Sequence, residues 1–217
     1  MIVEALTRPG VYRPVLKALQ GHTADGKNGG AGEDRLVVSG ASWESYLDVD
    51  RALGHDRAEP RLYYLDGELE ITTTSLRHER LKKWLTGFIE DYLLASGITA
   101  FPHGQATLRA LKEAGAEPDE SWCLGKEREY PDLVLEIALT SGGIDKLEIY
   151  QRFSVREVWL WRKDNLEIWT LKRSRSGYDG PHKKSRLLPG LNLADVIKCA
   201  GMDSWPQARL AFRRTLK

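Results

Sequence analysis

The spacing of apolar and polar residues changes along the chain, and each spacing predicts a different element. An apolar stripe with positions three and four residues apart predicts a long helix over about 76–96, ended by Gly97. Ser42 is placed to cap an earlier helix that continues to about 53. Further helices are predicted over about 145–153, 192–199 and 204–216.

Strand patterns lie between these helices. The clearest is a hairpin over 62–71, in which Asp66-Gly67 joins two strand-like runs because this dipeptide tolerates the positive φ angles of a type I′ turn. Beyond the turn, alternation places Glu68 and Glu70 on one face of the strand. Shorter strands are predicted near 98–101, 105–110, 122–124, 156–162, 166–172 and 185–188.

The order of the elements predicts the fold class. The run 131–138 is nearly continuous in apolar residues, as expected for a central strand covered on both faces. Helix, hairpin, long helix, strands, helix and strands together predict an α/β domain built around one mixed β-sheet flanked by helices. The glycine-rich stretch 21–33 indicates a connector. We therefore expect an N-terminal segment and flexible connector over 1–34, a core over 35–172, and a basic C-terminal extension packed on the core over 173–217.

Composition narrows the class of protein. A chain of 217 residues with 41% hydrophobic and 29% charged residues fits one ordinary globular domain and excludes a disordered chain. No apolar run approaches the ~18 residues needed to span a bilayer, and the first twelve residues lack the apolar stretch of a secretory signal. Two cysteines are too few for a disulfide framework. We therefore expect a cytoplasmic protein with no membrane partner.

The formal net charge of +1 hides an asymmetry. Residues 1–171 hold 21 Lys and Arg against 28 Asp and Glu, whereas residues 172–217 hold 11 against 3. A basic tail on an acidic body suggests a polyanionic partner, with a merely solvated charged surface as the alternative. Two basic clusters in the tail, 172–175 and 182–186, flank a glycine-containing loop and could contact phosphates without reading base sequence.

Glu136 is the main candidate for chemistry, because it interrupts the apolar run 131–138. A carboxylate among apolar neighbours must be paired, protonated or metal-bound unless it lies at a sheet edge. Asp132 shares the strand face but lies about 13 Å away, too far to share one cation. Asp119 lies seventeen residues before Glu136 and could return to the same strand end. Two carboxylates about one ion apart are the usual protein share of a Mg²⁺ site, and such a pair suits phosphodiester hydrolysis.

An ordered set of segments resembles the Uma-type putative restriction endonuclease family, part of the PD-(D/E)XK nuclease superfamily. The segments are Tyr64-Leu-Asp-Gly-Glu-Leu69, His78 in the first turn of the long helix, Pro118-Asp119, Pro131-Asp-Leu-Val-Leu-Glu-Ile137, Asp145-Lys146 with Tyr150, and Val155-Arg-Glu-Val-Trp-Leu160. The resemblance spans about 42–172. It implies a restriction-endonuclease-like core over 35–172, cleavage of DNA that depends on Mg²⁺ or Mn²⁺, and a homodimer.

The resemblance also implies roles for two acids and two further polar residues. Asp119 and Glu136 correspond to the two acids of the superfamily motif, and both would bind the metal. Glu68 would be a further metal or water ligand. His78, which helical spacing directs toward the sheet, would bind phosphate or orient an acid. A satisfied core histidine is the alternative for His78.

The catalytic lysine departs from the superfamily pattern. That pattern has lysine two residues after the second acid, where this chain has Ala138. The family resemblance indicates Lys146 as a relocated lysine that reaches back to the phosphate, with a solvated first-turn lysine as the alternative. Two functions follow: a metal-dependent endonuclease that hydrolyses DNA, or a catalytically inactive nuclease fold that serves as a DNA-binding or protein-interaction module.

Overall fold

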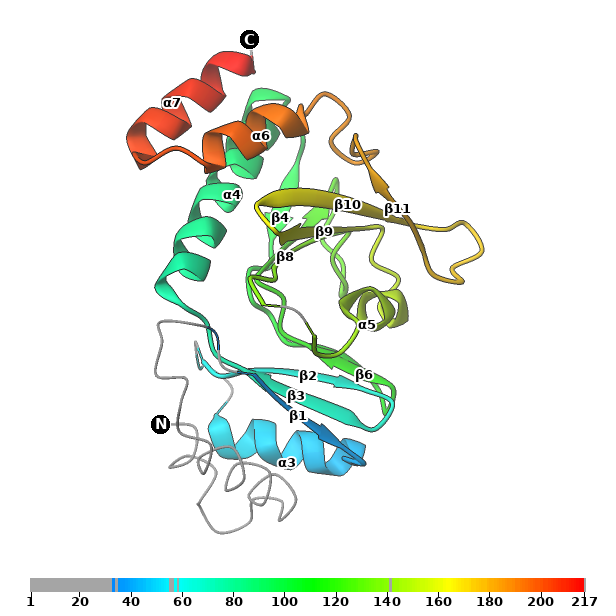
Figure 1. Ribbon diagram of the computed structural model, residues 1–217. Coiled ribbons are helices and arrows are strands. Elements are labelled where there is room, and N and C mark those ends of the chain that lie inside the picture. Colours follow the sequence, from blue (N-terminus) through cyan, green and yellow to red (C-terminus); the bar gives the residue numbers. More distant parts are fainter. Residues whose placement is uncertain (1–32, 34, 55–56, 58, 141, 217) are drawn as a thin grey trace.

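The computed structural model describes residues 33, 35–54, 57, 59–140 and 142–216 (Figure 1). Apart from Glu33, the predicted N-terminal segment therefore lies outside the described residues. The strands are β1 (Arg35–Ser39), β2 (Arg61–Leu65), β3 (Glu68–Thr72), β4 (Ala100–Pro102), β5 (Leu108–Ala110), β6 (Ala114–Ala116), β7 (Glu120–Leu124), β8 (Leu133–Ile137), β9 (Glu157–Arg162), β10 (Asn165–Leu171) and β11 (Tyr178–His182). The helices are α3 (Trp43–Leu53), α4 (Leu76–Ala95), α5 (Lys146–Arg152), α6 (Leu193–Ala200) and α7 (Trp205–Thr215).

The smaller sheet is built on the predicted hairpin. Its five antiparallel strands lie in the order β1-β3-β2-β6-β5. Asp66 and Gly67 have φ angles of 43° and 97°, as a type I′ turn requires, and this turn sets Leu65 opposite Glu68. The helix α3 covers the outer face of this sheet, and its predicted cap is confirmed because Ser42 accepts the backbone N–H of Ser45.

The larger sheet has six strands in the order β11-β10-β9-β8-β7-β4. The predicted central strand β8 is buried along its whole length. It runs parallel to β9, with α5 in the crossover connection, and antiparallel to β7. Because Glu120 pairs with Leu135, the residue just before β7, Asp119, lies beside the end of β8 that carries Glu136.

Apolar clusters join these layers. The helices α4 and α6 cover one face of the larger sheet, and α7 packs on the outer side of these two helices (Figure 1). The other face packs, together with α5, against the inner face of the smaller sheet. The predicted α/β class, with a mixed sheet flanked by helices, is confirmed. A layer of side chains packs between the two sheets, and the candidate site lies within this layer.

The C-terminal helix α7 is held on α4 by both apolar and charged contacts. The rings of Phe88 and Phe212 lie 4.7 Å apart between their centroids. Arg209 donates to both carboxylate oxygens of Asp91, at 2.8 and 3.0 Å. The charge of Arg209 in the basic tail is therefore used within the fold. Within the described residues, every helix is too short or too polar to cross a lipid bilayer.

Three sequence-based expectations are corrected. The single expected sheet is two sheets, because the unpredicted strand β6 pairs with the hairpin and leaves the larger sheet separate. Residues 185–188 form no strand, because backbone N–H groups of this segment donate to the Glu157 carboxylate, and the strand of this region is β11. The turn between β9 and β10 falls on Lys163 and Asp164, both with positive φ, one residue earlier than predicted.

Candidate active site

A cavity of about 30 Å³ lies between the two sheets, at the end of β8 from which Glu136 projects. Four of the predicted site residues line it together: His78 from α4, Asp119 before β7, Glu136 from β8 and Lys146 from α5. A volume of this size accommodates about one water molecule or one small ion. The cavity therefore offers room for an ion among carboxylates, and a phosphodiester group would meet it at its mouth.

Asp119 is fixed by donors on both of its oxygens. Its Oδ2 accepts the backbone N–H of Ile137 at 2.6 Å, which ties the loop before β7 to the end of β8. Its Oδ1 lies 2.7 Å from Nε2 of His78 and forms an ion pair with the guanidinium of Arg61. Asp119 is fully buried, so these partners offset the cost of burying its charge.

His78 links Asp119 to a second acid. The first turn of α4 directs it inward, as the helical spacing predicts, and the side chain is almost fully buried. Its Nδ1 is hydrogen-bonded to Oε1 of Glu33, while Nε2 faces Asp119. The ring therefore orients Asp119.

Glu136 lies between two tyrosine hydroxyls. Tyr150 donates to its Oε1, and Tyr63 Oη lies 3.3 Å from its Oε2. Burial raises the pKa of Glu136, and the ammonium of Lys146 opposes this rise. Burial and the charge of Glu136 raise the pKa values of both tyrosines well above their usual range, so both hydroxyls stay protonated as donors.

Lys146 projects from the start of α5 back into the cavity. Its Nζ lies 2.9 Å from Oε1 of Glu70 and 2.7 Å from the centroid of the Tyr63 ring, so an ion pair and a cation–π contact hold it. Burial lowers the pKa of Lys146, and Glu70 and Glu136 oppose this change. The ammonium is thus held close to both carboxylates.

The loop before α5 approaches Glu70 so closely that it requires glycine. Gly143 has a φ of +88°, and a Cβ there would collide with Oε2 of Glu70. The same oxygen accepts the backbone N–H of Ile144 at 2.8 Å. Glu70 therefore anchors both the lysine and the loop that leads to it.

The structure does not bring Glu68 to the cavity. Glu68 and Glu70 share a strand face, as predicted, but Glu68 lies next to the hairpin turn and is exposed, whereas Glu70 is fully buried. The two-residue turn sets Tyr63 opposite Glu70, so both point between the sheets. The acid from this hairpin at the candidate site is therefore Glu70.

Sequence reasoning missed Glu70, Arg61, Tyr63 and the contact between Tyr150 and Glu136. The hairpin register was the available signal for Glu70. Counted from the Asp66-Gly67 turn, Glu70 lies two residues further than Glu68 from the solvent-exposed end of the hairpin. Arg61 gave no signal, since a strand arginine is usually exposed, yet its side chain is only 3% exposed here.

Among the described residues, no three His, Cys, Asp or Glu side chains are arranged to hold a metal ion together. Asp119 and Glu136 nevertheless line one cavity, and Mg²⁺ commonly takes one or two carboxylates, with water and substrate phosphate as its other ligands. The donor chemistry of this pair therefore fits Mg²⁺.

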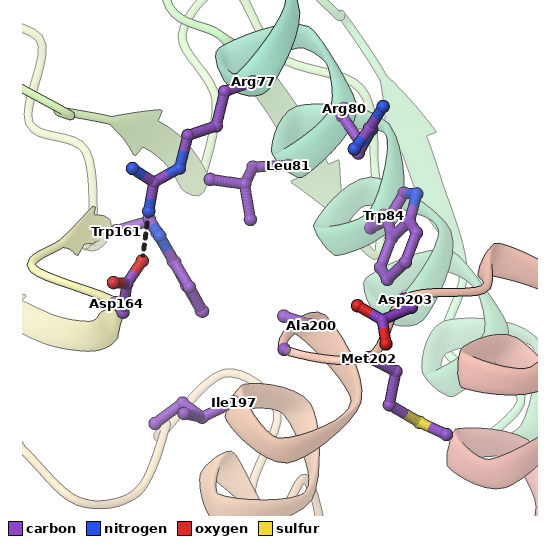
Figure 2. Close-up of a pocket in the computed structure, with 11 residues that line it drawn as sticks. Arg77, Arg80, Leu81, Trp84, Trp161, Asp164, Ile197, Ala200, Met202 and Asp203 are labelled. Carbon is purple, nitrogen blue, oxygen red and sulfur yellow. Dashed lines mark hydrogen bonds and ion pairs between the residues drawn. The ribbon is translucent and has the colours of Figure 1, made fainter.

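A larger cavity of about 380 Å³ lies elsewhere, between α4, α6 and the turn after β9 (Figure 2). Its two acids lie on opposite walls: Asp164 is paired with Arg77 at 2.7 Å, and Asp203 faces solvent (Figure 2). Arg77 neighbours His78 in sequence but points to this other side of α4. Because no acids converge here, volume alone does not make this cavity the candidate active site.

The fold and site define an α/β protein with buried acids and a lysine gathered at the end of a central strand. Comparison with known families then identifies it: the chain belongs to the Uma2 family, described as "Putative restriction endonuclease", whose model matches residues 43–195. The predicted family and the restriction-endonuclease-like class of its core are thereby confirmed. The match supports a nuclease as the class of activity.

Other comparisons are less informative. No curated protein matches the chain. Among solved structures, the chain is similar to one titled a putative nuclease belonging to DUF820 from Anabaena variabilis, with a TM-score of 0.47 and 13% sequence identity. This similarity covers 65% of this chain and 92% of that chain.

Proposed function

We propose that this protein is a metal-dependent endonuclease that hydrolyses phosphodiester bonds in DNA. One observation carries the proposal: Asp119, Glu136 and Lys146 come from three separate elements and line one small cavity between the sheets. Membership of a nuclease family supports the reaction class. The choice of DNA and the dependence on Mg²⁺, with Mn²⁺ as an alternative, are parts of the proposal itself.

Asp119 and Glu136 would hold the cation through their carboxylate oxygens. When bound, Mg²⁺ supplies Lewis-acid stabilisation of charge on the phosphoryl oxygens. His78 keeps Asp119 in place through its Nε2, and Tyr150 keeps Glu136 in place through its hydroxyl. These fixed partners limit the reorganisation that ion binding requires.

Lys146 would stabilise the phosphate. Its ammonium is positioned by Glu70 at 2.9 Å and by the Tyr63 ring, and burial strengthens its interaction with an anion. Such a preorganised positive charge lowers the energy of the more highly charged transition state. Lys146 would thus take the role that the superfamily pattern assigns to a lysine at the position of Ala138.

The proposal is tested by nicking of a supercoiled plasmid. Wild type should nick the plasmid with Mg²⁺ or Mn²⁺ and stop when EDTA is added. Glu136→Gln, which keeps the shape of the side chain, should lose at least about 100-fold in rate. Glu68→Gln removes an exposed acid that does not line the cavity and should retain wild-type activity. Equal nicking by wild type and Glu136→Gln would refute the assignment.

A second candidate is a nuclease fold without catalysis that serves as a DNA-binding or protein-interaction module. Two observations favour it: Ala138 stands at the usual lysine position, and the buried acids already have protein partners, including Arg61 on Asp119 and Lys146 on Glu70. This candidate predicts no heat of Mg²⁺ or Mn²⁺ binding in calorimetry and DNA affinity that survives Asp119→Ala.

Assembly and location are proposed on the family resemblance and composition alone. We propose a homodimer in the cytoplasm. Light scattering coupled to size-exclusion chromatography should give a mass of about twice 24.5 kDa. A mass of one chain across the concentration range would contradict the dimer.

A further inference from the structure

A third cavity, of about 370 Å³, lies at the other end of the larger sheet from the candidate active site. Glu157, which lines it, pairs with Leu133, whereas Glu136 pairs with Leu160 on the same two strands. Three residue steps along a strand correspond to about 10 Å. The two cavities are therefore separate sites on one sheet.

Basic side chains from three segments of the chain surround this cavity: Arg156, Lys172, Arg173, Arg175 and Arg186. Four of them belong to the basic tail, which has 11 Lys and Arg against 3 Asp and Glu. Among the described residues, those four side chains form no ion pair, while Arg156 contacts Asp132 at 3.4 Å. The fold therefore gathers much of the tail's positive charge around one concave surface.

The one acid in this cavity offsets only one of the five positive charges, and neutral donors of the protein occupy both of its oxygens. Glu157 is fully buried and accepts from Trp159 Nε1 at 3.0 Å, from Ser185 Oγ at 2.6 Å and from the backbone N–H of Arg186 at 2.6 Å. These bonds hold the 185–187 segment against the sheet. Glu157 thus shapes the cavity and positions Arg186.

One buried donor in the cavity wall is without a partner. Thr170 is 8% exposed, and its Oγ1 has no hydrogen-bond partner among the described residues. A buried hydroxyl left unpaired costs about 1–3 kcal/mol, so such a group indicates an expected ligand or water. Thr170 pairs with Glu157 across β9 and β10, which places it at the same end of the sheet as the arginines.

We propose that this cavity binds a phosphate of a nucleic-acid backbone, outside the segment that is cleaved. The arginines supply planar donors that match phosphate oxygens, and Thr170 supplies one further hydroxyl donor. The inference rests on the proposed function only in taking DNA as the nucleic acid. It adds a second anchoring point at the opposite end of β8 and β9 from the candidate active site.

The test is the salt dependence of DNA binding by the full chain, measured by fluorescence anisotropy with a labelled duplex in EDTA. The slope of log affinity against log salt is negative, and replacing both Arg175 and Arg186 with alanine should reduce its magnitude by about 2. The control double variant Lys198→Ala/Arg214→Ala removes the same charge from exposed positions of α6 and α7 and should retain the wild-type slope. Thr170→Val should weaken binding several-fold without lowering the urea midpoint, because it removes a hydroxyl that has no partner in the fold.

Equal slopes for the two double variants would overturn the proposal, because the positive charges around the cavity would then contribute no more to DNA binding than charges elsewhere on the surface. Calorimetry with inorganic phosphate separates the sources of the ligand. Phosphate binding that depends on Arg175 and Arg186, combined with DNA binding that does not, would assign a free phosphate and overturn the nucleic-acid inference. DNA binding is measured without metal, so this test is independent of cleavage. If wild type does not nick the plasmid but the two double variants still differ in slope, only the endonuclease function is refuted.

Discussion

The substitution Glu70→Gln tests how the candidate site is built. Glu70 is fully buried and accepts from Lys146 at 2.9 Å and from the Ile144 backbone at 2.8 Å. Glutamine keeps the shape and can still accept from Ile144, but it removes the charge that faces Lys146. The ammonium then remains in a largely buried position with a weaker counter-charge.

The magnitude follows from that geometry. Removing one partner of a buried ion pair costs about 3–5 kcal/mol. The Lys146 side chain is 18% exposed and also interacts with Glu136, so we expect about 3 kcal/mol, at the low end of that range. Lys146 would also lose the contact that positions it, and a misplaced group costs about 100-fold in rate.

Two assays with one matched control decide the outcome. Urea denaturation should show a lower midpoint with an unchanged slope for Glu70→Gln, and plasmid nicking under conditions where the variant is folded should be about 100-fold slower. Glu68→Gln changes the same residue type two positions away on the same strand and should match wild type in both assays. If Glu70→Gln and Glu68→Gln behave alike, Glu70 does not organise this site.

Three further predictions concern the lysine, the α4–α7 contact and a buried tyrosine. Lys146→Met should abolish nicking. Ala138 lines the same cavity, so adding Ala138→Lys to this variant should raise the nicking rate at least about tenfold. No recovery of the rate would exclude a relocated lysine. Asp91→Ala should lower the free energy of unfolding by about 2 kcal/mol in urea titrations, because Arg209 loses both of its bonds, and a change below about 0.5 kcal/mol would contradict this. Burial raises the pKa of Tyr46 from 10.0 to about 12, so its contribution to stability is complete below pH 10 and is lost as pH rises toward 12. Wild type should therefore lose more stability than Tyr46→Phe between about pH 9 and pH 12, and parallel losses would refute the shift.

Elements encoded by local patterns could be predicted from the sequence. The long helix α4 and the β2–β3 hairpin each carry their period and their end signals within about twenty residues. The strand β6 could not be predicted, because Ala114-Gly-Ala116 has no alternation, and Gly115 is needed there by the close approach of the Tyr46 ring. The division into two sheets depends on that strand and so on pairing between distant segments.

The site was predictable where one residue contradicted its surroundings. Glu136 stood out because it is an acid inside an apolar strand, and the structure buries it. Alternation could not decide between Glu68 and Glu70, since both side chains lie on the same face of the strand. They differ only in their distance along the strand from the hairpin turn. The partner Arg61 required the packing of both sheets, which no local pattern contains.

Dependence of plasmid nicking on Mg²⁺ concentration tests the central claim most directly. If Asp119 and Glu136 hold the ion, wild type is inactive in EDTA and saturates with Mg²⁺. Asp119→Asn should then need more than about tenfold higher Mg²⁺ to reach half of its own maximal rate. Nicking by wild type in EDTA, or the same Mg²⁺ dependence in both proteins, would contradict a metal-dependent nuclease site between these two sheets.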